Sequence, residues 1–166
     1  LGVLDPAGKP TGRLDVVKAA QVARLSQEEF DAARKPMIAT CQKCHAPAFV
    51  ATQFKNSEDL IREADHLMAE GIRVVAALYQ DGVLQKPKDY ASAFPDLLTF
   101  HDAPTVPEQK LFVMFLEHRM RTFQGAFHNS PDYALWYGWS EMVRDLTEIK
   151  EAAADLRARA PKANKK

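Results

Sequence analysis

The spacing of apolar residues toward the end of the chain predicts a long helix. From Pro131 to about Ala160, apolar side chains recur at alternating steps of four and three residues, which is typical of a helix with one continuous apolar stripe. This apolar seam consists of Leu135, Trp139, Met142, Leu146, Ile149, Ala153 and Leu156. Ser130-Pro131-Asp132, an N-cap residue followed by proline, marks the start of the helix. The seam can pack on an earlier helix or on another chain, and we favour packing within the chain.

Start and stop signals predict further helices upstream. Ser57-Glu58-Asp59 is expected to cap a helix that ends at Asp81-Gly82, with glycine in the left-handed position. Pro107 fits the first turn of a helix that reaches about Phe127 and contains the apolar run LFVMFL, so this helix is expected to be central. A capping-box pattern at residues 26–29 opens a helix toward the cysteines, with Pro36 as a kink or a boundary.

These patterns predict an all-α fold. No strand pattern competes with the helices, and we expect a bundle of about four to five helices with two long antiparallel C-terminal helices. Residues 1–166 are predicted to form a single domain with an irregular arm at 1–13, a helical bundle at 57–160 and a basic tail at 161–166. Residues 14–56, which include a possible short helix at 14–25, carry the cysteines and form a segment of their own.

Composition and charge narrow the class of protein. The chain has 166 residues, of which 46% are hydrophobic and 27% charged, so it can bury a sizeable core. Lys+Arg and Asp+Glu both number 22, which gives no electrostatic reason to expect a nucleic-acid partner. No apolar run has the length that spans a bilayer. The first residues contain neither an initiator Met nor a signal peptide, so we expect a processed N-terminus or a piece of a longer protein.

Both cysteines lie in one motif, CQKCH at residues 41–45. A zinc site needs four ligands, usually with a second close pair, and no second cysteine pair exists. A thioredoxin-like redox pair is typical of a βαβ setting, which the pattern lacks. Covalent haem attachment fits the motif best, and zinc, redox chemistry and coincidence remain the alternatives.

The C-x-x-C-H spacing has a specific chemical reason. Two thiols at this spacing can add to the two vinyl groups of one haem, and the adjacent histidine then reaches the iron. We therefore predict a covalent, iron-containing haem c, with Cys41 and Cys44 forming the thioethers and His45 as the proximal ligand. Residues 14–56 are then a haem-attachment segment. Because bacteria attach haem c outside the cytoplasmic membrane, we expect a periplasmic or other extracytoplasmic protein.

The sixth iron ligand is less well defined by the sequence. His128 ends the fourth predicted helix, Gly125 one turn earlier would let a flat ring come close, and aromatic residues surround it. We predict His128 as an axial ligand of this haem or a neighbouring one; a histidine that interacts with the helix dipole is the alternative. His118, on a mixed face, is the weaker candidate. We expect His66 to be a surface histidine and His101 a loop residue.

Several motifs together give a family resemblance. CQKCH, DLLTF at 96–100, RMRTFQGAFH at 119–128 and NSPDY with WYGW at 129–139 resemble the C-terminal region of octahaem cytochromes similar to hydroxylamine oxidoreductase. Pentahaem nitrite reductases are similar more distantly. The resemblance covers most of the chain from about Leu14 onward. CQKCH alone is not specific to this family, and the glycine-to-tryptophan stretch is much more so.

The resemblance implies a place for this chain in a larger enzyme. The last haem of the series would be held by Cys41, Cys44 and His45. His128 would be an axial ligand and, by analogy with the nitrite reductases, would bind the preceding haem. Since the chain has a single C-x-x-C-H, the catalytic haem would lie outside it, on a partner chain or an upstream segment. The chain is therefore not expected to be catalytic alone.

Electron transfer by a multihaem oxidoreductase acting on small nitrogen compounds is the expected function. Electrons would pass through an exposed haem edge to another haem-bearing chain or redox cytochrome. The alternatives are a stand-alone monohaem cytochrome, a haem-based gas-binding module, and an oligomerisation element that associates through its C-terminal helices.

Overall fold

The computed structural model describes residues 9, 12, 27–86, 95–97 and 105–160. The predicted N-terminal arm, the helix predicted at 14–25, His101 and the basic tail lie outside the described residues or almost wholly so. Most of the connection between the third and fourth predicted helices does as well.

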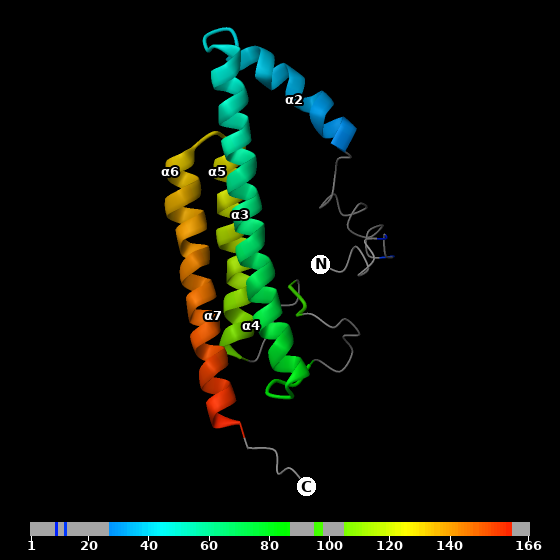
Figure 1. Ribbon diagram of the computed structural model, residues 1–166, viewed down its shortest axis with the longest axis vertical. Coiled ribbons are helices and arrows are strands. Elements are labelled where there is room, and N and C mark those ends of the chain that lie inside the picture. The colour runs from blue at the N-terminus through cyan, green and yellow to red at the C-terminus, as the bar shows by residue number, and fades with distance from the viewer. Residues whose placement is uncertain (1–8, 10–11, 13–26, 87–94, 98–104, 161–166) are drawn as a thin grey trace. The chain divides into compact units, whose positions relative to one another are not determined.

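All regular structure in the described ranges is helical, which confirms the predicted all-α class (Figure 1). The first two helices are α2 (Gln27–Cys41) and α3 (Pro47–Gln80). The next runs without a break through α4 (Val106–Val113), the π-helical stretch η2 (Met114–Arg119) and α5 (Met120–Phe127). The last runs through α6 (Pro131–Tyr133), the π-helical stretch η3 (Ala134–Trp139) and α7 (Ser140–Arg159).

The chain divides into two compact units, Leu1–Phe54 and Lys55–Lys166. The division falls inside α3, close to position 56/57, where the sequence places the end of the cysteine-containing segment. In the first unit, Arg34 of α2 lies between two aromatic rings, 4.9 Å from the ring centre of Phe30 and 4.7 Å from that of Phe54. Phe30 lies on α2 itself, and the cation–π contact with Phe54 joins α2 to α3.

Three helices pack side by side in the second unit (Figure 1). Arg119 pairs with Asp65 at 2.7 Å, whereas Tyr79, further along α3, hydrogen-bonds Glu108 at 2.5 Å. Later residues of α3 thus meet earlier residues of the α4–α5 helix, so these two helices are antiparallel. The third helix, α6–α7, runs parallel to α3, because Glu70 pairs with Lys150 and Asp81 with Arg157.

The core of this bundle confirms the internal packing predicted for the apolar seam. Leu78, Leu84 and Ala153 form a buried cluster, and Val74 and Leu156 pack against it. Met142, Leu146 and Ile149 are buried as well. The first part of the seam differs from the prediction, because Leu135 is exposed and Ala134 and Gly138 are buried instead.

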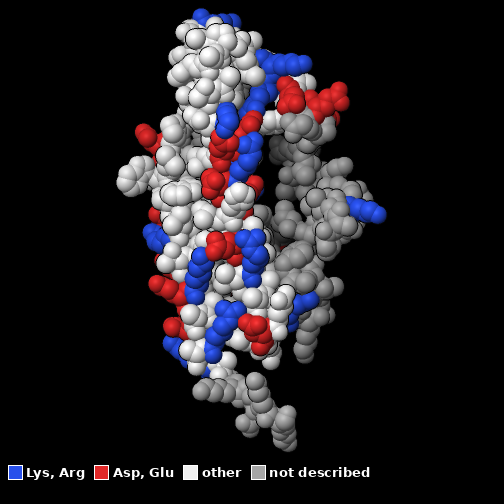
Figure 2. Space-filling view, viewed as in Figure 1, with Lys and Arg blue, Asp and Glu red and all other residues white. Residues whose placement is uncertain are grey.

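The outward side of α3 is polar. Arg62 pairs with Glu58 and Asp59 one turn away, and Lys55 also pairs with Asp59. Figure 2 shows acidic and basic side chains mixed along the middle of the view, where α3 runs in Figure 1. Such pairs keep a helix face solvated and add little stability. No helix in the described ranges is both long enough and apolar enough to cross a membrane.

The helix start predicted at Ser57 was wrong. Ser57 does not cap a helix, because α3 begins ten residues earlier at Pro47 and passes through it. Residues 48–56 contain neither glycine nor proline, so nothing interrupts the helix there. Of the two outcomes expected at Pro36, a kink or a boundary, the boundary does not occur, because α2 continues to Cys41.

The end of α3 at Gly82 is as predicted. Gly82 has φ +69, and the N–H of Val83 donates to the carbonyl of Leu78 at 3.0 Å. This is the Schellman arrangement, in which a left-handed residue lets the following N–H groups reach the last helical carbonyls. Val83 also packs against the cluster that contains Leu78.

Candidate functional site

The CQKCH motif continues the last turn of α2. Cys41 is the final residue of α2, and its carbonyl accepts the N–H groups of Cys44 at 3.2 Å and His45 at 3.0 Å. Cys41 and Cys44 are free thiols, the first partly exposed and the second exposed. Residues three apart in a helical turn lie on one side of it. The backbone therefore presents both sulfur atoms from one turn.

His45 follows this turn and is exposed. Its ring centre lies 5.1 Å from that of Phe49 in the first turn of α3, which begins at Pro47. Phe49 is itself exposed and adds an apolar ring beside the imidazole. The motif thus combines two accessible thiols, an accessible imidazole and an apolar neighbour.

The motif supplies the types of group that covalent haem attachment uses. Among the residues that the structure describes, no group of three or more His, Cys, Asp or Glu side chains is placed to hold a metal ion. A structural zinc site needs four such ligands. Haem c takes two thiols for its thioethers and one imidazole for its iron.

His128 belongs to the second unit and lies at the turn between α5 and α6. It is the C-cap of α5 and is exposed. Asn129 after it has φ +49, and the N–H of Ser130 donates to the carbonyl of Gly125 at 2.8 Å. Asparagine is one of the few residues that adopt this left-handed conformation readily. This second Schellman turn fixes the backbone at His128 and leaves its side chain in solvent.

Exposed aromatic residues precede and follow His128 in the chain, at the end of α5 and in α6 and η3. This exposed aromatic set comprises Phe127, Tyr133, Trp136 and Tyr137. The ring centre of Phe127 is 4.7 Å from that of Phe123, and those of Tyr133 and Tyr137 are 5.4 Å apart. Several exposed aromatic rings near one end of a helix pair are typical of a surface that binds a ligand or another protein.

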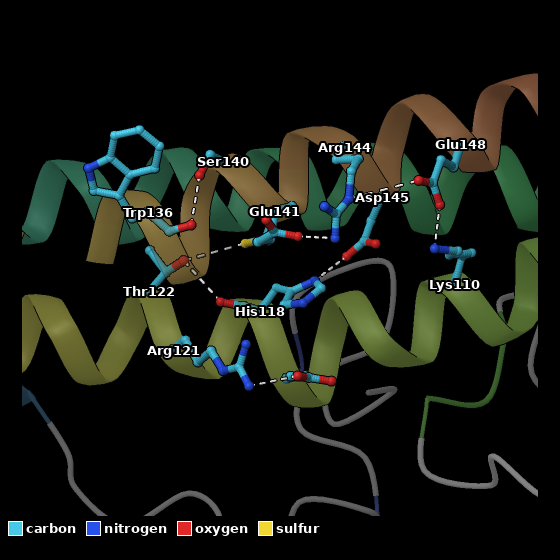
Figure 3. Close-up of polar contacts among 12 residues, drawn as sticks. Lys110, His118, Arg121, Thr122, Trp136, Ser140, Glu141, Arg144, Asp145 and Glu148 are labelled. Carbon is cyan, nitrogen blue, oxygen red and sulfur yellow. Dashed lines mark hydrogen bonds and ion pairs between the residues drawn. The ribbon is translucent and has the colours of Figure 1, made fainter. Parts of the chain in front are cut away.

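His118 occupies a different environment, inside the bundle. It lies in η2 and is buried, and its Nδ1 is 2.5 Å from Oδ2 of Asp145 in α7 (Figure 3). Asp145 is only 1% exposed, and its Oδ1 has no hydrogen-bond partner among the described residues. A haem plane could reach this ring only if the helices separated, so burial favours a structural role for His118 over iron binding.

Asp145 should give the stability of the fold a pH dependence. Burial is the main cause that raises the pKa of Asp145, and the hydrogen bond and charge of His118 oppose it. The folded chain therefore holds this proton to a higher pH than the unfolded chain, whose aspartates titrate near about 3.9. The contribution of Asp145 to stability is thus fully present below that pH and is lost as the pH rises through the folded-state pKa.

Urea unfolding of wild type and Asp145→Asn over a series of pH values measures this contribution. The free energy of unfolding of wild type, relative to the variant, is expected to fall with rising pH across this window. Asp155→Asn is the control, because Asp155 lies on the same helix with its side chain 72% exposed. A difference between wild type and Asp145→Asn that stays constant with pH would contradict the prediction.

The sequence did not reveal Asp145 as the partner of His118. Asp145 sits directly before Leu146 of the apolar seam, and a single carboxylate beside a seam is usually solvated. Only the pairing of α7 with η2 shows that it is buried. Once these two helices are known to pair, the positions of His118 and Asp145 along them indicate that the two side chains meet.

Comparisons of the chain with models of known protein families, with curated proteins and with solved structures found no match. The functional interpretation therefore rests on the motifs and on the geometry of Cys41, Cys44, His45 and His128.

Proposed function

We propose that the chain is an electron-transfer module that carries one covalent c-type haem on Cys41 and Cys44. The observation that carries the proposal is the geometry of CQKCH, in which two free thiols on one helical turn are followed directly by the exposed imidazole of His45. No other pair of thiols exists in the chain.

The residues of the motif have distinct chemical roles. Each thiol adds across one vinyl group, so that a carbon–sulfur bond forms and the thiol hydrogen goes to the other vinyl carbon, and no oxidant is consumed. His45 would supply one ring nitrogen to the iron, and the ring of Phe49, whose centre lies 5.1 Å from that of His45, would offer an apolar surface beside it. When bound, the group supplies one-electron exchange between Fe(III) and Fe(II).

The family resemblance extends this proposal to a larger assembly. We infer that the chain is the C-terminal module of a hydroxylamine oxidoreductase-like multihaem enzyme, acts outside the cytoplasm and passes electrons to a haem-bearing partner chain. His128 would be an axial ligand of this haem or a neighbouring one. Its exposure and the exposed aromatic set support this role, because an axial histidine needs an open path to a flat apolar group.

Removing the thiols is expected to abolish haem attachment. In Cys41→Ser/Cys44→Ser, expressed with a haem c maturation system, no covalent haem should remain after denaturation, since neither thioether can form. Haem-stained gels and intact mass measure this directly. Lys43→Ala, inside the same motif, is the control and should retain haem. A matured wild-type chain without haem would overturn the proposed function.

Replacing His128 by alanine is expected to change one iron from six-coordinate low spin to high spin in the assembled complex, because the iron loses an axial nitrogen. Electron paramagnetic resonance and absorption spectra report this change. His66→Ala is the control, because His66 is also exposed but lies within α3. Unchanged spectra in His128→Ala would remove His128 from the ligand set. A wild-type complex that is already high spin and shifts with carbon monoxide would instead indicate the gas-binding alternative.

A further inference from the structure

The beginning of the last helix faces the bundle with different residues from those that its sequence pattern favours. An unbroken α-helix through the apolar seam would bury Leu135 and Trp139. In the structure, Ala134 and Gly138 are buried, whereas Leu135 is 43% exposed. From Met142 onward, the predicted and observed core faces agree.

The cause is the π-helical stretch η3. The N–H of Ser140 donates to the carbonyl of Leu135, five residues back, so this turn holds one residue more than an α-helical turn. Ala134, Gly138 and Met142 consequently share one face at two successive steps of four. The facing helix has the same feature in η2, where Met114, His118 and Thr122 are buried at steps of four.

Close backbone packing and two hydroxyl groups hold this observed register. A Cβ on Gly138 would lie 2.6 Å from Cα of Thr122, so the two helices meet where one has no side chain. Ser140 Oγ donates to the carbonyls of Leu135 at 2.7 Å and Trp136 at 2.9 Å. Thr122 Oγ1 donates in the same way to the carbonyl of His118 at 3.0 Å (Figure 3). These bonds satisfy carbonyls at the irregular turns.

The same sequence supports a second register. If η3 became regular α-helix, residues 131–139 would turn by about 100° relative to α7, which is the rotation of one residue. Leu135 and Trp139 would then replace Ala134 and Gly138 against the facing helix. This alternative register buries larger apolar side chains but requires the helices to move apart, since Gly138 would no longer form the contact.

We propose that residues 131–139 are a two-register segment that can exchange between the observed π-helical register and an α-helical register in which Leu135 and Trp139 are buried. Trp136 is 70% exposed and Tyr137 58% exposed in the observed register. In the alternative register, each residue takes the place of the one before it, so Trp136 moves to the position now held by Leu135, which is 43% exposed. The Trp136 ring is therefore presented most fully in the observed register.

This device links the surface at His128 to the packing of the bundle. A molecule that binds the Trp136 ring in its most exposed position stabilises the observed register. The inference does not depend on a haem, because it concerns only the last two helices. Its test can therefore fail without affecting the proposed function, and the reverse also holds.

Fluorescence quenching of Trp136 by acrylamide tests the proposal in the full chain. Trp136 and Trp139 are the two tryptophans, so Trp139→Phe leaves Trp136 as the sole reporter. Adding Gly138→Ala disfavours the observed register. We expect cooperative unfolding to persist while quenching falls by roughly 1.5-fold, as Trp136 moves from a position that is 70% exposed to one that is 43% exposed. Gly71→Ala is the control, because its Cβ would meet only side-chain atoms, the nearest at 3.0 Å, and should leave quenching unchanged.

A second variant tests the extra residue itself. Deletion of Tyr137 removes one residue from η3, so that Ala134, Gly138 and Met142 follow the regular steps of three and four. We expect this variant to remain helical and cooperatively folded, with Trp136 as accessible as before the deletion. Any of three results would overturn the proposal: a Gly138→Ala variant that unfolds, a Gly138→Ala variant with unchanged quenching, or a Tyr137 deletion that does not fold.

Discussion

Replacing His118 by leucine is expected to lower the free energy of unfolding by about 1–3 kcal/mol, the usual cost of leaving a buried polar group without its hydrogen-bond partner. Leucine fills a similar volume but has no group that can hydrogen-bond Oδ2 of Asp145, which lies 2.5 Å from Nδ1 of His118. Because Oδ1 of Asp145 already has no partner in the described part of the chain, the whole buried carboxyl group would be left without a hydrogen bond. Urea unfolding monitored by circular dichroism gives the value.

Two further variants separate this effect from a general loss of histidine. His66→Leu lies on the exposed side of α3 and should change stability by less than about 0.5 kcal/mol. The double variant His118→Leu/Asp145→Leu should recover part of the loss, since it removes the unpaired carboxyl group together with its partner. If His118→Leu alone were as stable as wild type, the buried pair would not stabilise the bundle.

Ile149→Ala should have a comparably large effect, with a loss of about 2–5 kcal/mol. Ile149 is fully buried, and a Cβ built on Gly71 would lie 3.7 Å from its Cδ1 and 3.0 Å from Cδ1 of Leu111. The side chain thus sits where all three helices of the second unit meet, and neighbours held by three helices cannot easily close the cavity. Thermal and urea unfolding both measure the loss.

Val143→Ala is the matched control for this cavity. Val143 lies on the same helix, but it is among the exposed apolar residues, so its truncation leaves no cavity. We expect a change below about 1 kcal/mol. Equal losses in Ile149→Ala and Val143→Ala would mean that the three-helix junction is not the core of this unit.

Local signals in the sequence were enough to predict most helices and two of their ends. Gly82 and Ser130-Pro131 act within a few residues of themselves, so their effect does not depend on the rest of the fold. Ser57 shows the limit of such signals. A serine at an N-cap and a serine inside a helix have the same local sequence, and only the uninterrupted helix from Pro47 decides between them.

The π-helical stretches could not be predicted from the apolar pattern. The regular seam favours Leu135 and Trp139 inside, whereas the structure selects Ala134 and Gly138 because small residues let the two helices approach closely. That choice depends on Thr122 across the interface. Burial of His118 depends in the same way on α7, which is why its mixed sequence neighbours left its role open.

The sequence motif largely defined the candidate site at CQKCH, because its residues are consecutive. The structure adds that both thiols are free and come from one turn, and that His45 and His128 are exposed. His128 would bind the iron of this haem or of a neighbouring one. The sequence predicts His128 as a ligand but does not identify which iron it binds.

The short turn at His128, Asn129 and Ser130 has a consequence for the order of folding. It joins two helices whose contacts pair residues such as Thr122 with Gly138, so the loops closed by these contacts are short. Contacts between residues near in sequence form fast. The C-terminal helix pair is therefore expected to form early, and α3, which meets it only across long sequence separations, to dock onto it afterwards.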